Sequence, residues 1–93
     1  MIARRYFVSG MVQGVGFRYF AQRSAAKHQI RGFIRNLSDG RVEAFVEGSE
    51  RAVIAFKEDI AAGPPFSNVE MLEEIVEDPT DQYSTFSIEK DNK

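Results

Sequence analysis

Val12-Gln13-Gly14-Val15-Gly16-Phe17-Arg18 is the stretch that decides the fold, because it joins an apolar run to the start of a helical pattern. Glycine adopts positive φ angles and lets the backbone come close to a ligand. Successive N–H groups in such a turn point into one concavity, and a helix N-terminus adds further unpaired donors. Arg18 adds a planar fork of donors that matches a pair of phosphoryl oxygens. The stretch therefore predicts a cradle for an oxyanion with its own cation.

The segments around this cradle predict the order βαββαβ followed by a short terminal strand. A β-rich run covers residues 3–10, and apolar residues between 17 and 28 recur every three or four positions, as on one face of a helix. The later strands and the second helix are expected at residues 31–37, 41–47, 49–62, 69–76 and 85–89. This order is the split βαβ or ferredoxin-like arrangement. We expect an α+β sandwich, with an antiparallel sheet, two helices on one face and a short extra C-terminal strand.

Length and composition restrict the class of protein. The 93 residues contain no repeat or linker, so we expect a single domain over residues 1–93. A net charge of −2 provides no general attraction to nucleic acid or anionic lipid. The absence of cysteine and the presence of one histidine exclude disulfides and argue against a structural zinc site. Without a signal peptide or an apolar run of membrane-spanning length, a cytoplasmic monomer is the simplest expectation.

Charge and ring size select the register of the hairpin formed by the second and third strands. A three-residue loop pairs Phe33 with Phe45 and Arg35 with Glu43, whereas a two-residue turn would turn Arg35 toward the apolar face. Aromatic and opposite-charge pairs across a ladder contribute ~0.2–1 kcal/mol each. The favoured register places Asn36 on the face that the helices cover, near one end of its strand.

A polar Asn36 on that face must find partners, because burying an unpaired amide is costly. If its strand lies beside the first strand, Asn36 approaches the loop after Gly10 and the start of the first helix. Asn36 and Arg18 would then converge on the concavity of residues 13–18. The alternative, in which Asn36 only caps a loop or ends a strand, stays open on spacing alone.

Three segments of the chain closely resemble the acylphosphatases. They read Gly10-Met11-Val12-Gln13-Gly14-Val15-Gly16-Phe17-Arg18-Tyr19, Gly32-Phe33-Ile34-Arg35-Asn36 and Asp39-Gly40-Arg41-Val42-Glu43. The resemblance extends over nearly the whole chain, including Gly63-Pro64-Pro65 before the fourth strand. Small departures are Met11, where a basic residue is common, and Phe33, where tryptophan is frequent.

This resemblance implies a ferredoxin-like fold and hydrolysis of acyl phosphates to carboxylate and inorganic phosphate, with no metal and no cofactor. In the family pattern, Arg18 holds the phosphoryl group and Asn36 positions the attacking water. The cradle is formed by the backbone of Gln13, Gly14, Val15, Gly16, Phe17 and Arg18. The expected partners are a small-molecule acyl phosphate as substrate and phosphate as product, without nucleic acid or membrane.

Two other functions compete with this interpretation. RNA-recognition motifs share the topology and stack bases on sheet aromatics, and the favoured register turns Phe7, Phe33 and Phe45 to the open face. The net charge and the missing basic, aromatic-rich strand signature argue against RNA binding. A catalytically silent partner module is the third possibility, against which the intact Arg18 and Asn36 argue.

Other motifs carry less weight. The glycines lack the third member of a dinucleotide fingerprint, and no Gly-Lys-Ser/Thr follows them as in a P-loop. His28 ends the helical stripe, where it is expected to favour the helix dipole rather than to catalyse. The acidic residues between Glu70 and Asp78 are expected to be solvated surface.

Overall fold

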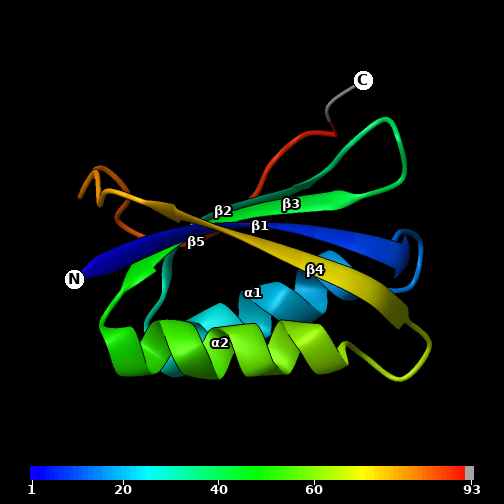
Figure 1. Cartoon of the computed structure of the whole chain (residues 1–93), viewed down its shortest axis with the longest axis horizontal. Coiled ribbons are helices and arrows are strands. Elements are labelled where there is room, and N and C mark those ends of the chain that lie inside the picture. The colour runs from blue at the N-terminus through cyan, green and yellow to red at the C-terminus, as the bar shows by residue number, and fades with distance from the viewer. Residues whose placement is uncertain (92–93) are drawn as a thin grey trace.

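The computed structural model of the protein describes residues 1–91 and contains every predicted element in the predicted order (Figure 1). The elements are β1 (Ile2–Met11), α1 (Phe17–His28), β2 (Arg31–Asn36), β3 (Val42–Gly48), α2 (Glu50–Ala62), β4 (Asn68–Glu77) and β5 (Phe86–Ile88). The strands form one sheet in the order β4-β1-β3-β2-β5, and both helices lie against the same face of it (Figure 1). The ferredoxin-like α+β fold is confirmed.

One feature of the sheet differs from the expectation of antiparallel pairing. The four longer strands are antiparallel to their neighbours, but β5 runs parallel to β2, with Gly32 opposite Phe86, so the sheet is mixed. The reason is geometric. β4 ends at the end of the sheet where β2 begins, as the pairing of Ala3 with both Glu47 and Glu77 shows. The chain crosses the sheet at that end, so its next strand must run in the direction of β2.

The main core lies between the sheet and the two helices. Its largest fully buried apolar side chains come from both layers, and they are Tyr6, Phe17, Ile34, Phe56 and Ile60. Burying a large apolar side chain contributes roughly 1.5–3 kcal/mol, so this layer supplies most of the driving force for folding. The second helix begins where the sequence predicts, because the Ser49 hydroxyl accepts a hydrogen bond from the Ala52 N–H (3.1 Å).

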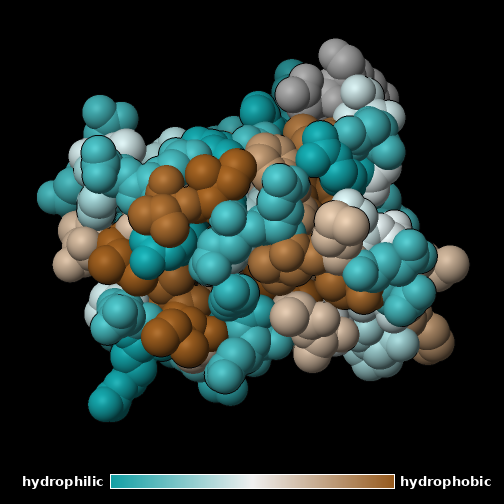
Figure 2. Space-filling model, viewed as in Figure 1, coloured by the Kyte–Doolittle hydropathy of each residue, from teal (hydrophilic) through white to brown (hydrophobic). Residues whose placement is uncertain are grey.

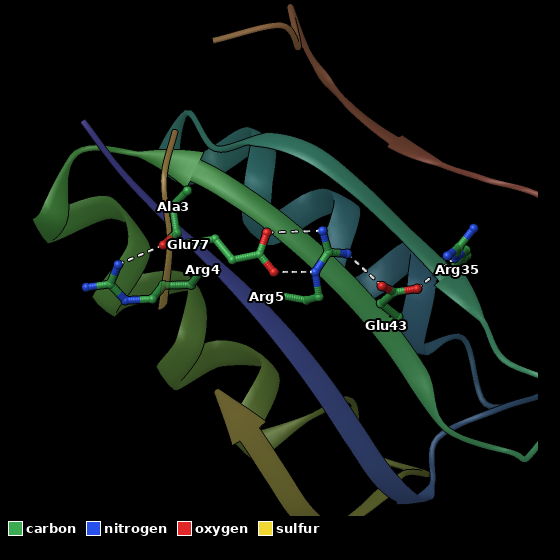
Figure 3. A network of polar contacts seen from close by, with 6 residues as sticks. All are labelled: Ala3, Arg4, Arg5, Arg35, Glu43 and Glu77. Atoms are coloured by element: carbon green, nitrogen blue, oxygen red, sulfur yellow. Dashed lines mark hydrogen bonds and ion pairs between the residues drawn. The ribbon is translucent and has the colours of Figure 1, made fainter. Parts of the chain in front are cut away.

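An ion-pair network on the open face confirms the predicted hairpin register, in which Phe33 pairs with Phe45 and Arg35 with Glu43. The Arg5 guanidinium lies between two carboxylates (Figure 3). It donates two hydrogen bonds to Glu77 (2.6 and 3.2 Å) and one to Glu43 (2.6 Å). Arg35 donates to the other oxygen of Glu43 (2.8 Å). The network therefore connects β4, β1, β3 and β2 across the sheet.

Residues 78–85, which link β4 to β5, lie on the same open face. The fully buried carboxylate of Glu47 accepts hydrogen bonds from the backbone N–H groups of Thr80 and Asp81. Tyr83 packs on Phe33 and Phe45, with ring centroids 6.0 and 5.7 Å away. We call residues 78–85 the strap.

The strap covers two of the three aromatic rings on which RNA bases would have to stack. Phe33 is only 8% exposed and Phe45 only 2% exposed. The third aromatic of that face, Phe7, has the Arg41 guanidinium 4.9 Å above its ring. Within residues 1–91, all three rings are therefore engaged by other side chains, and none forms the free aromatic platform of an RNA-recognition motif.

The face formed by β4 and α2 carries separate hydrophobic patches divided by hydrophilic residues (Figure 2). The exposed apolar side chains there include Ile54 and Val76, at 52% and 71% exposure. Within residues 1–91, neither helix is long and apolar enough to cross a membrane.

Replacing Glu47 by alanine should detach the strap from β3. Hydrogen bonds to a charged group contribute about 1.5–3 kcal/mol, so the free energy of unfolding should fall by about that amount in urea titrations. The exposed Gln82 of the strap provides the control, and Gln82→Ala should change stability by less than about 0.5 kcal/mol. A Glu47→Ala protein as stable as the wild type would show that the strap is held by other contacts.

Candidate active site

The turn between β1 and α1 is built by two glycines with left-handed backbone. Gly14 has a φ of 75° and Gly16 a φ of 77°. A Cβ atom at either position would meet no atom within 4 Å. The requirement for glycine therefore comes from the backbone conformation and not from lack of space. Gly16 also occupies the N-cap position of α1, where it offers no side-chain acceptor to the first turn.

The N–H groups of residues 13–19 have no hydrogen-bond partner in the part of the chain that the structure describes. On either side of this run, the Val12 N–H bonds to Gly10 O (3.1 Å) and the Phe20 N–H to Gly16 O (3.0 Å). Unpaired N–H groups at the start of a helix, together with the positive end of the helix dipole, form a site for an anion. Residues 13–19 therefore present a run of free donors, which the cradle hypothesis requires.

Arg18 stands in the first turn of α1, directly after this run. Its guanidinium Nη1 donates to the Asp91 carboxylate at 2.8 Å, and the two side chains are 29% and 40% exposed. Arg18 thus already binds a carboxylate, which presents a pair of oxygen atoms to the guanidinium as a phosphoryl group would.

Asn36 ends β2 opposite Val42, on the helix-covered face as predicted. The residue is only 7% exposed, and its Oδ1 is buried without a hydrogen-bond partner among residues 1–91. A buried polar atom without a partner costs about 1–3 kcal/mol. Such an atom in a native fold calls for an explanation, and a role in a site is one of the recognised ones.

Two connections bring the Arg18 and Asn36 regions of the chain together. Gln13, at the start of the cradle, donates from Nε2 to the carbonyls of Leu37 and Arg41, both at 2.9 Å. The Glu89 N–H bonds to Ile34 O (2.9 Å), so the chain after β5 continues along β2 before Asp91 reaches Arg18. No hydrogen bond between Arg18 and Asn36 themselves occurs within residues 1–91.

A second polar cluster joins the two helices, but its geometry is not that of a nucleophilic serine with its histidine base. The Ser24 hydroxyl donates to Asp59 (2.7 Å), and His28 Nε2 lies 3.2 Å from the same carboxylate oxygen. Hydrogen bonding from Ser24 is the main reason that the pKa of Asp59 lies below its usual value. A nucleophilic serine needs the histidine beside its own hydroxyl, and here Asp59 stands between them. Within residues 1–91, no three acidic or histidine side chains are grouped to hold a metal ion.

Sequence reasoning missed two partners. Asp91 lies beyond the last expected strand, and its contact with Arg18 depends on the parallel placement of β5. Asp59 is one acidic residue among several on α2, and only the packing of α1 against α2 identifies it. Neither position carries a local signal such as a motif or a turn.

The chain matches the family model described as Acylphosphatase over residues 4–88. The chain belongs to the acylphosphatase family. A relative named acylphosphatase from Bacillus velezensis is 42% identical over 95% of this chain and 98% of its own length. The crystal structure of acylphosphatase from Bacillus subtilis is also 42% identical, with a TM-score of 0.92 over 96% of this chain and 99% of that one. The chain is therefore an enzyme of this family, whose activity is the hydrolysis of acyl phosphates.

Members of this fold also occur within longer proteins. The crystal structure of T. kodakarensis HypF matches all of this chain with a TM-score of 0.84 and 36% identity, but the match covers only 12% of the HypF chain. The acylphosphatase from B. subtilis, by contrast, matches this chain over nearly its full length.

Replacing Asp91 by asparagine should strengthen the binding of inorganic phosphate. The neutral amide no longer competes for the Arg18 guanidinium, and a partly exposed ion pair contributes about 0.2–1 kcal/mol. The dissociation constant for phosphate should fall by up to about fivefold in calorimetric titrations. Weaker binding by Asp91→Asn would instead show that Asp91 orients Arg18 for the ligand.

Proposed function

We propose that this enzyme hydrolyses acyl phosphates at the cradle of residues 13–19, with Arg18 and the free N–H groups binding the phosphoryl group and Asn36 orienting the attacking water. The oxygen of water bonds to phosphorus as the bond from phosphorus to the acyl oxygen breaks. The carboxylate leaves with that electron pair, and a phosphoryl oxygen takes the proton that water gives up. No metal ion takes part.

The run of unpaired N–H groups beside Arg18 carries this proposal. Phosphoryl transfer requires mainly positioning and the neutralisation of charge on the equatorial oxygens. Preorganised donors supply that neutralisation without having to reorganise during the reaction. A guanidinium adds a full positive charge and two parallel hydrogen bonds. The same set of donors repels cations, so the site favours an anionic substrate by itself.

Asn36 suits the water-positioning role better than the role of a base, because an amide does not take up a proton near neutral pH. Its buried Oδ1 has no partner in the described residues, so the amide is not committed to a structural hydrogen bond through that atom. A half-turn about χ2 exchanges Oδ1 and Nδ2 with little change of shape. Either orientation offers one hydrogen-bonding group to water, and in the carbonyl orientation the amide oxygen would accept a hydrogen bond from the attacking water.

The chemistry of the substrate explains why a metal ion is unnecessary. An acyl phosphate has a carboxylate as leaving group, which departs readily without protonation or metal coordination. The donors of the cradle are N–H groups and a guanidinium, and these bind phosphate oxygens rather than divalent cations.

Hydrolysis of a model acyl phosphate in the presence of a chelator tests the proposed function. The wild type should turn over fully in EDTA. Arg18→Lys keeps the charge but loses the planar fork, so kcat/KM should fall at least about tenfold, as expected for the loss of a charged hydrogen bond. Arg23→Lys, an exposed position on the same helix, is the matched control and should keep wild-type activity.

Two results would contradict this proposal. One is activity that EDTA abolishes and a divalent ion restores. The other is tight phosphate binding without turnover, which a catalytically silent module would show.

Replacing Asn36 by alanine should separate turnover from binding. A group that acts mainly on the nucleophile in the transition state affects kcat, whereas uniform binding affects KM. We expect kcat to fall ~10²–10³-fold, as for other preorganised groups, while inorganic phosphate inhibits competitively at a nearly unchanged concentration. Asn68→Ala on the exposed strand β4 is the control. Full turnover by Asn36→Ala would leave Asn36 with a structural role only.

A further inference from the structure

We infer that Gln13 is a positioning residue for this reaction: its side chain fixes the cradle against the hairpin that carries Asn36, and so sets the geometry between the phosphoryl group and the attacking water. The inference rests on the proposed function. It assigns to the Gln13 side chain a role apart from that of its backbone in the cradle.

The hydrogen bonds of Gln13 define its orientation. Nε2 lies 2.9 Å from the carbonyl oxygen of Leu37 and 2.9 Å from that of Arg41. Both neighbours are acceptors, so the NH₂ group must face them, and each of its two hydrogens is used. Only Oε1 is left to face anything else, and an acceptor oxygen does not bind an anion. The Gln13 side chain is therefore unsuited to hold the phosphoryl group itself.

The two carbonyls that Gln13 bonds also close the hairpin. The Leu37 N–H donates to Arg41 O (2.8 Å), and the Gly40 N–H donates to Leu37 O (3.2 Å). Gln13 thus supplies the second hydrogen bond to each carbonyl and completes their capacity as acceptors. Because Leu37 directly follows Asn36, the hydrogen bonds of Gln13 reach the chain one residue from the proposed water-positioning group.

Phe17 and Val15 anchor the cradle in the core, but the rest of the cradle makes few polar contacts. Its two glycines carry no side chains, and the space around their Cβ positions is open. Its N–H groups are unpaired in the described part of the chain, and a substrate needs them unpaired. Within residues 1–91, the hydrogen bonds that residues 13–17 make to another segment are those of Gln13. The cradle must keep its own N–H groups free for the ligand. The Gln13 side chain therefore provides its polar link to the hairpin and points away from the ligand.

The hydrogen bonds of Gln13 affect how the phosphoryl group is aligned with the attacking water. In-line attack needs water and phosphorus held close to the reactive geometry, and a displacement of about 1 Å can cost ~10²-fold in rate. Arg18 and Asn36 reside on different elements, α1 and β2. A side chain that joins the two regions therefore influences kcat more than the binding of phosphate, which uses the cradle alone.

A double-mutant cycle between Gln13 and Asn36 tests this inference. Gln13→Met keeps the length of the side chain and removes both donors. In the wild-type background it should lower kcat about 10–100-fold, the range seen for supporting residues around a site. The inhibition constant for inorganic phosphate should change less than about threefold, because the cradle and Arg18 are retained. In the Asn36→Ala background, Gln13→Met should lower kcat less than about threefold, because the water-positioning amide that Gln13 aligns is already absent.

Gln82→Met, at an exposed position of the strap, is the matched control for Gln13→Met and should leave kcat unchanged. Thermal melting establishes that each variant is folded, and Gln13→Ala replaces Gln13→Met in the cycle if the latter does not fold. Unchanged kcat in Gln13→Met overturns the inference, as does an equal loss in both backgrounds or a loss of phosphate binding as severe as that of Arg18→Lys. Failure of both Gln13 variants to fold also overturns it, since Gln13 would then be required by the fold. An inactive wild type would instead contradict the proposed function.

Discussion

The left-handed backbone at Gly14 and Gly16 is the constraint on which the candidate site depends. These two residues lie in the turn between β1 and α1, where the N–H groups of residues 13–19 have no partners in the described chain. A residue with a side chain would be strained at either φ angle. The turn also sets Arg18 in the first helical turn, where its charge adds to the dipole of α1. The fold thus presents a concentration of positive potential on a chain whose net charge is −2.

The sheet and helices keep this turn beside the end of β2. The antiparallel β1–β3–β2 pairing places the hairpin loop next to the end of β1, and the hydrogen bonds of Gln13 join the two directly. On the opposite face, the buried Glu47 and the packing of Tyr83 on Phe33 and Phe45 hold the strap across the sheet. The strap in turn delivers β5 to the edge beside β2, from which the chain continues to Asp91 and Arg18. The two faces of the sheet therefore both contribute to the surroundings of one arginine.

Much of this arrangement could be predicted from local patterns. The glycine pair and the helical stripe depend on neighbouring residues, so they predicted the start of α1 at Phe17. The hairpin register followed from pairing charges and rings. The parallel direction of β5, the Glu47 contacts and the Arg18–Asp91 pair involve residues more than 30 positions apart. No periodicity or motif encodes such contacts, because they arise only after the strap has crossed the sheet.

We propose that the free N–H groups of residues 13–19 and the Arg18 guanidinium together form the phosphoryl site. Titration of the ¹⁵N-labelled protein with inorganic phosphate, followed by amide and guanidinium resonances, tests it most directly. We expect saturable shifts centred on the amides of residues 13–19 and on Arg18 Nε, with much smaller shifts in the strap and in α2. Unchanged resonances in residues 13–19 at saturating phosphate, or saturable shifts centred elsewhere, would contradict it.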